Sequence, residues 1–265
     1  MKYCLILSVL LHLKMYSQFS TSSSSISHLE VNYLVKFQRD TANTQSLSQE
    51  VASLLIGEKT SVFKSTQKVI YDSLTLAEVD KSIKNAGGGT VMLNLQNVPS
   101  PRIISEVYKD SDRVYIYDEV LKTGFLYPVD AKLDWNILNE TKIISGYTCR
   151  RAEVTFNRRS YTAWFTADLP FSEGPYIFKG LPGLVLEVSD SANLYSFQLA
   201  GLKKVVKPIV APSGIETTHT KFSKVRSDFM GDPVGVFESQ TKFKTPFKDR
   251  DRIIKLHQSN NNFIF

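Results

Sequence analysis

The chain has 265 residues, of which 42% are hydrophobic and 22% charged, an ordinary balance for a globular protein. This length allows one large β domain or two small ones, and the 11% of aromatic residues favours β structure. The formal net charge is only +6 and comes without a dense basic patch or a nucleic-acid-binding motif, so we expect no nucleic-acid partner.

The N-terminal residues have the pattern of a cleavable signal peptide, which we place at residues 1–17. Lys2 gives a positive start, and residues 3–13 form an apolar run too short to cross a bilayer as a helix. We expect cleavage just before Gln18, although Met15 is larger than the usual residue at this place. The alternative, a buried N-terminal helix, lacks helical caps. The sequence thus predicts export, to the periplasm, the outer membrane or the medium, with no transmembrane segment in the mature chain.

The cysteines and histidines predict neither a disulfide nor a metal site. Cys4 lies before the apolar run and leaves with the signal peptide, so Cys149 stands alone. We expect Cys149 to be a small buried residue, with a reactive or intermolecular thiol as the alternative. His28, His219 and His257 are not spaced as zinc ligands, and no phosphate-loop motif is present, so we predict no metal and no cofactor.

The first half of the chain predicts strands followed by one helix. Alternating apolar residues indicate strands, and apolar residues at three- and four-residue steps indicate a helix. The predicted elements are a strand at 26–37, a polar loop at 39–49, a hairpin at 51–64 turning near Gly57, a helix at 65–85 and a triple-glycine loop at 87–89.

The second half predicts an antiparallel meander, because short strands follow one another at spacings near ten residues. The predicted strands are 103–109, 114–119, 124–128, 142–156, 160–166, 184–188 and 195–206, followed by a short helix at 221–230. We therefore expect a mainly β (α+β) fold, a curved antiparallel sheet or half-barrel with one or two short helices. The β-rich domain would span residues 26–230, and residues 231–265 would form a polar, basic, partly disordered tail.

The most distinctive segment begins with an aromatic-rich strand at 161–166 and continues into a connection rich in proline and glycine. This connection ends in Leu-Pro-Gly-Leu at residues 181–184. Pro182 fixes φ at about −65°, and Gly183 readily takes a positive φ, so the sequence predicts a type II turn.

The same segment resembles the GLPGLI family, exported proteins found mainly in Bacteroidetes. The motif stands here as Gly-Leu-Pro-Gly-Leu-Val, and the matching positions are 180–185, with Gly180, Pro182 and Gly183 as structural residues, flanked by 144–149, 161–166 and 174–175. The family has no settled biochemical role, so the resemblance implies export and leaves the function open. A weaker similarity, to envelope proteins with a lipoprotein-carrier-like fold, implies a sheet half-closed around a hydrophobic cavity.

The sequence leaves three functions open. A non-enzymatic protein would bind an apolar ligand (a lipid, an acyl chain or a peptide) around the connection, unless the same side chains simply fill the core. The candidate ligand-binding residues are Trp164, Phe165, Phe171, Phe178, Leu181 and Leu184. An interaction partner of an envelope transport or secretion system would use the sheet edge and the basic segment 242–255. An uncharacterised hydrolase is the third, but we identify no catalytic residue, and we expect Asp168 to anchor a turn and Glu173 to be solvated.

Overall fold

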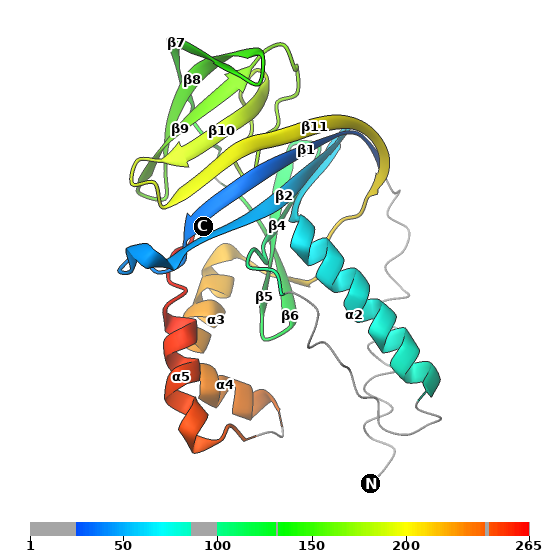
Figure 1. Ribbon diagram of the computed structural model, residues 1–265, viewed down its shortest axis with the longest axis vertical. Coiled ribbons are helices and arrows are strands. Elements are labelled where there is room, and N and C mark those ends of the chain that lie inside the picture. Colours follow the sequence, from blue (N-terminus) through cyan, green and yellow to red (C-terminus); the bar gives the residue numbers. More distant parts are fainter. Residues whose placement is uncertain (1–24, 86–99, 131, 242–243, 265) are drawn as a thin grey trace.

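The computed structural model describes residues 25–85, 100–130, 132–241 and 244–264 (Figure 1). The predicted signal peptide and the triple-glycine loop lie outside these residues. None of the helices in the described ranges is long and apolar enough to span a membrane.

Twelve strands of the described chain form one open sheet. Their bounds are β1 (Ser25–Gln38), β2 (Leu47–Gly57), β3 (Thr60–Ser65), β4 (Glu106–Asp110), β5 (Arg113–Val120), β6 (Thr123–Pro128), β7 (Asn136–Ile144), β8 (Tyr147–Phe156), β9 (Arg159–Thr166), β10 (Leu184–Asp190), β11 (Tyr195–Ile209) and β12 (Ile215–Glu216). The strand order is β12-β6-β5-β4-β3-β2-β1-β11-β10-β9-β8-β7, and only the β12–β6 pair is parallel. The mainly β fold with a curved antiparallel sheet is confirmed.

The sheet bends along its longest strands. Figure 1 shows β1, β2 and β11 as a long curved ribbon, with β7–β10 on one side of it and β4–β6 on the other. One expected strand differs, because residues 142–156 contain the turn between β7 and β8. Ser145 and Gly146 both have positive φ, 49° and 87°, the backbone of a type I′ hairpin turn, so a continuous strand was the wrong prediction there.

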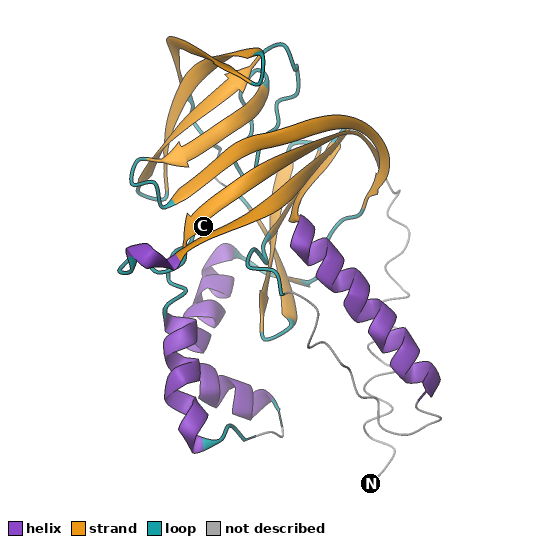
Figure 2. Cartoon of the chain, in the orientation of Figure 1, coloured by secondary structure: helices purple, strands orange, loops and turns teal. Residues whose placement is uncertain are grey.

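Four α-helices complete the described chain: α2 (Thr66–Asn85), α3 (His219–Gly231), α4 (Pro233–Gln240) and α5 (Phe247–Gln258), with a short 3-10 turn, η1 (Thr44–Ser46). Figure 2 shows the helices away from the end of the sheet that carries β7–β10. The helices predicted near α2 and α3 are confirmed. Residues after 230 differ from the expected tail, because Asp232 caps α4 by accepting a hydrogen bond from the Gly235 amide at 2.8 Å, and Ile264 near the chain end is buried.

The core lies on the inner face of the bend. Tyr33 and Phe63 are buried there, from β1 and β3. The connection between β9 and β10, residues 167–183, crosses this face and fills it with its own side chains. Tyr176 contacts Phe63 with ring centroids 6.4 Å apart, and Phe178 lies 5.8 Å from Phe197 of β11. Each such ring contributes about 1.5–3 kcal/mol of burial, so the connection belongs to the core.

Candidate functional site

The Pro-Gly corner leads from the connection into β10 and is tied to the beginning of the connection. The Gly183 amide donates to the Leu181 carbonyl at 2.8 Å, while the Leu184 amide donates to Leu169 at 2.9 Å. This is the hydrogen bond of a three-residue turn centred on Pro182, so the predicted type II turn is replaced by a tighter one. The predicted positive φ of Gly183 is confirmed at 150°.

Gly183 is required for a second reason. A Cβ at this position would lie 2.1 Å from the Thr166 carbonyl oxygen, which no side chain can tolerate. Gly180 also has a positive φ, 94°, but a Cβ there would meet nothing within 4 Å. The corner therefore depends on close backbone approach at Gly183 and only on backbone conformation at Gly180.

The six candidate ligand-binding residues do not converge on one cavity. Trp164 and Phe171 are half-buried, and each lines a different surface hollow. The other four are core residues that are at most 2% exposed: Phe165, Phe178, Leu181 and Leu184.

The larger hollow, here called the Phe171 hollow, has a volume of about 500 Å³. Three stretches of chain surround it: residues 56–60 at the β2–β3 turn, residues 109–112 at the β4–β5 turn, and residues 170–173 of the connection. Phe171 and Pro170 supply an apolar wall, and Lys109 and Glu173 supply charge. The hollow is open and its lining is mostly polar, so a ligand there would lie between charged groups and a small apolar wall.

A buried ion cluster adjoins the Phe171 hollow, which two of its members, Lys109 and Glu173, line. The Glu173 carboxylate accepts from Lys109 Nζ at 2.9 Å and from Ser61 Oγ at 2.9 Å, and it pairs with Lys179. Glu173 is 6% exposed and Lys179 is 7% exposed. The prediction of a solvated Glu173 was wrong, because the connection places this residue against Ser61 of β3 and Lys109 of β4.

Lys179 is held as an ammonium by three oxygen acceptors. These are the Glu173 carboxylate, Ser61 Oγ at 3.2 Å and the Gly174 carbonyl at 3.4 Å. The Ser61 proton goes to Glu173, so its oxygen is free to accept from Lys179. Three acceptors match the three N–H groups of a protonated lysine. With Lys109, the cluster then has two positive charges and one negative charge.

Burial and charge oppose each other in this cluster. Burial acts to raise the Glu173 pKa, but the charges of Lys179 and Lys109 and their hydrogen bonds outweigh it, so the pKa lies below its usual value. Burial lowers the pKa of Lys179, and the charge of Glu173 only partly offsets this effect. Every N–H group of Lys179 therefore has an acceptor within the cluster. Lys109 lies at the edge of the hollow, where it also pairs with Glu173.

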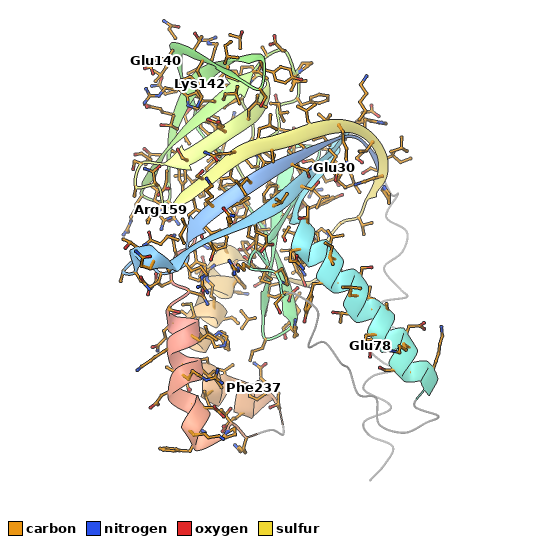
Figure 3. All side chains as sticks on the ribbon, viewed as in Figure 1. Glu30, Glu78, Glu140, Lys142, Arg159 and Phe237 are labelled. Carbon is orange, nitrogen blue, oxygen red and sulfur yellow. The ribbon has the colours of Figure 1, made fainter. Side chains whose placement is uncertain are left out.

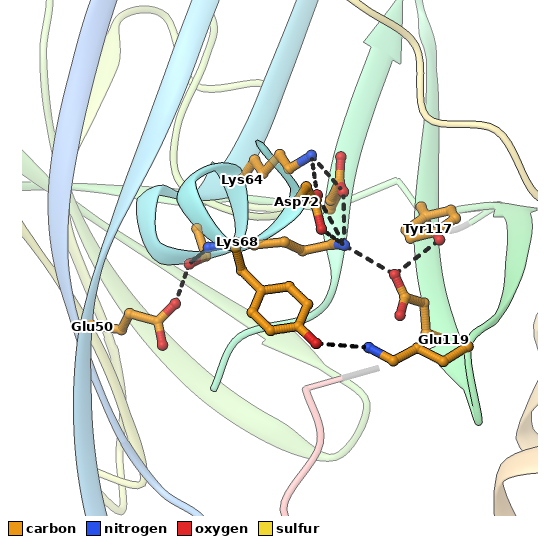
Figure 4. Close-up of polar contacts among 10 residues, drawn as sticks. Glu50, Lys64, Lys68, Asp72, Tyr117 and Glu119 are labelled. Atoms are coloured by element: carbon orange, nitrogen blue, oxygen red, sulfur yellow. Dashed lines mark hydrogen bonds and ion pairs between the residues drawn. The ribbon is translucent and has the colours of Figure 1, made fainter. Parts of the chain in front are cut away.

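A second ion cluster lies under the first turns of α2 (Figure 4). Lys68 Nζ lies 2.9 Å from Glu119 and 3.3 Å from Asp72, and Lys64 Nζ lies 3.1 Å from Glu106. Figure 4 also shows Tyr117 bonded to Glu119. These contacts join the helix to β3, β4 and β5. Neither hollow includes this cluster, so we assign it to helix docking.

Two further reactive side chains, His219 and Cys149, line neither hollow. His219 Nε2 lies 2.9 Å from Ser223 Oγ on α3, and burial, followed by the charge of Arg226, lowers the His219 pKa. Cys149 is buried as expected, and burial raises its thiol pKa to about 11. Within the described ranges, no three His, Cys, Asp or Glu side chains gather as metal ligands.

Comparisons with known proteins found one similar family profile and similar solved structures. The sequence profile of the family described as N-glycanase peptide, N-terminal domain, matches residues 93–223, a little under half of the chain. This match includes the Pro-Gly corner, the connection and strands β4 to β11. No curated protein matches the sequence.

Two solved structures of PNGF-II are similar to this chain. The structure in space group P21 has a TM-score of 0.50 at 15% identity, and that in space group C2 has a TM-score of 0.49 at 16% identity. Both matches cover 75% of this chain and 32% of that chain, so this chain spans about a third of the PNGF-II length. The likeness shows a shared fold, and the chain is similar to the N-terminal domain of an N-glycanase.

Proposed function

We propose that this chain is a non-enzymatic binding domain whose Phe171 hollow takes a ligand with a carboxylate and an apolar portion. The position of Lys109 at the edge of the hollow supports this proposal. Lys109 makes one polar contact among the described residues, with Glu173, so it keeps N–H groups for a ligand. Phe171 and Pro170 provide an apolar wall beside it.

An acyl chain with a free carboxylate fits these features. The carboxylate would pair with Lys109, and the hydrocarbon would lie against Phe171 and displace water. A purely apolar ligand has less support, because four of the six residues expected to bind it fill the core. Three exposed charges, Glu58, Lys59 and Asp112, lie at the rim, and water weakens the repulsion of an anionic ligand by the two carboxylates.

The likeness to the N-terminal domain of an N-glycanase supports a role as an accessory domain. We propose further that the chain is exported and belongs with the GLPGLI proteins, on the strength of its N-terminal pattern and its Gly-Leu-Pro-Gly-Leu motif. N-terminal sequencing of the protein isolated from cell envelopes tests export. The expected first residue is Gln18, and a protein that retains Lys2 in the cytoplasmic fraction would refute export.

Calorimetric titration of the full chain with straight-chain carboxylates from acetate to octanoate tests the ligand. Each buried CH₂ group contributes about 0.8 kcal/mol, so affinity should rise about fourfold per added carbon until the hollow is full. Octanol, which lacks the charge, should bind more weakly than octanoate. Leucine-containing dipeptides with free and amidated C-termini show whether a peptide carboxylate is preferred to an acyl chain.

Three variants connect binding to the hollow. Lys109→Met should remove the preference for octanoate over octanol and leave Glu173 paired with Lys179. Phe171→Ser should flatten the dependence on chain length. Lys204→Met, an exposed lysine on β11, is the matched control and should bind as the wild type does. Equal octanoate affinity in Lys109→Met and wild type would refute the site.

A further inference from the structure

The sheet face opposite to the core carries a second set of side chains on β8–β11. Trp164 points away from the buried Phe165, because successive side chains of a strand alternate between faces. Across the strands, Trp164 pairs with Arg151 on β8 and with Glu187 on β10. Glu187 in turn pairs with Gln198 on β11, so these four side chains form one row.

A row of small hydroxyl side chains lies beside the first. Thr162 pairs with Ser189, and Ser189 pairs with Ser196. All members of the two rows except Arg151, together with Lys142 and Asn193, line a hollow of about 150 Å³. We call this set of two rows the Trp164 face. It offers hydroxyl, amide and carboxylate groups next to one large aromatic ring.

Lys142 covers the exposed side of the Trp164 ring. Its Nζ lies 4.5 Å from the ring centroid and pairs with Glu187. The Lys142 side chain is 38% exposed and lies on the edge strand β7, near Glu140 (Figure 3). An exposed cation over a ring is held weakly, so a ligand can displace it.

The Trp164 face has no excess of positive charge, because three carboxylates pair with two cations. Lys142 pairs with Glu187, and Arg151 pairs with Glu140 at 2.6 Å and with Glu153. An anionic ligand would therefore gain no net attraction. The paired groups remain good donors and acceptors for a neutral ligand rich in hydroxyl groups.

From this arrangement we propose that the Trp164 face binds an uncharged oligosaccharide. A pyranose ring has an apolar C–H face and a rim of hydroxyl groups that both donate and accept hydrogen bonds. Its C–H face stacks on Trp164 in place of Lys142, and its hydroxyl groups bond to Glu187, Gln198 and the hydroxyl row. This site lies on the other face of the sheet from the Phe171 hollow and goes beyond the function proposed above.

Tryptophan fluorescence tests the site directly. The sequence contains two tryptophans, so Trp135→Phe leaves Trp164 as the sole tryptophan of the full chain. Titration of this variant with cellohexaose, chitohexaose and a free high-mannose N-glycan should give a saturable change in emission with at least one of them. Unchanged emission with all three at millimolar concentration would overturn the proposal.

Calorimetry with the sugar that binds then locates the contacts. Trp164→Ala should abolish binding, and Trp164→Phe should retain part of it. Gln198→Ala should weaken binding about 2- to 12-fold, the range of a lost hydrogen bond. Lys142→Ala should strengthen binding about 2- to 5-fold, because it uncovers the ring.

Two controls keep the outcomes separate. Gln198 is exposed and Lys142 is partly exposed, so their variants remain informative if Trp164→Ala fails to fold. Lys109→Met should bind the sugar as wild type does, which distinguishes this proposal from the function of the Phe171 hollow. If both Gln198→Ala and Lys142→Ala bind sugar with wild-type affinity, the Trp164 face is not the site.

Discussion

The two faces of the β9–β10 region each carry a lysine–glutamate pair in different surroundings. On the inner face, Glu173 and Lys179 are buried and every N–H of Lys179 has an acceptor. On the outer face, Lys142 and Glu187 are partly exposed, and Lys142 also lies over a ring.

The same chemistry therefore serves two purposes. A buried pair costs desolvation energy and is stable only when both members remain, so it fixes the connection in one place. An exposed pair contributes little to the free energy of folding and is easily separated, so a ligand can displace one of its members. Removing one lysine at a time measures this difference.

The largest expected effect is that of Lys179→Met, which leaves Glu173 buried with one cation fewer. We expect a loss of about 3–5 kcal/mol in the free energy of unfolding, measured by urea denaturation. Lys142→Met on the outer face is the matched control and should change it by less than about 1 kcal/mol. Equal losses would show that burial does not separate the two pairs.

The second-largest expected effect is a loss of stability from changes in the Pro-Gly corner, which positions the inner pair. Gly183→Ala should cost about 3 kcal/mol, because strain at positive φ adds to the overlap with the Thr166 carbonyl. In Gly180→Ala the added methyl group has no atom within 4 Å, so the loss in the free energy of unfolding should be only about 1 kcal/mol. Thermal and urea unfolding of both variants compare them, and a Gly180 loss as large as that of Gly183 would contradict the close-approach argument.

A double variant shows whether the inner pair stabilises the fold or only avoids a penalty. Glu173→Gln with Lys179→Met removes both charges, and we expect a stability within about 1 kcal/mol of wild type. The double variant should then be more stable than Lys179→Met alone. Additive losses from the two changes would mean that each residue acts independently.

The smallest expected effect is on the pH dependence of the free energy of unfolding. The folded-state pKa of Glu173 lies below its usual value of 4.5, so the unfolded chain binds more protons in mild acid. The stability from this group is fully present above about pH 4.5 and is lost as pH falls through the lower, folded-state pKa. Urea midpoints between neutral pH and about pH 3 should fall less steeply in the double variant; parallel slopes would contradict this assignment.

Local patterns predicted the strands well because alternation and turn residues are local signals. They failed at residues 142–156, where Ser145 and Gly146 interrupt an apolar run without a proline. They also missed the helices after residue 230. Asp232 and Pro233 form the N-terminus of α4, but the many charged residues of this segment suggested a disordered tail.

The site was harder to predict than the fold, because its members meet only in space. Ser61, Lys109 and Glu173 come from two strands and a long connection. One signal was present in the sequence. Lys179 follows Tyr-Ile-Phe and precedes Gly-Leu-Pro, and a lysine within such an apolar stretch points to burial with an acidic partner. Trp164 was among the residues expected to bind a ligand, but its neighbours depend on strand register.

The position of β1 sets the order in which the chain can fold. The first described strand lies in the middle of the sheet, between β2 and β11, and its partner residues in β11 begin at Tyr195. The hairpin of β1 and β2 can form early, but its other edge stays open until most of the polypeptide is available. Such distant pairing slows folding, so a newly made molecule spends longer with an unpaired central strand that is prone to aggregation.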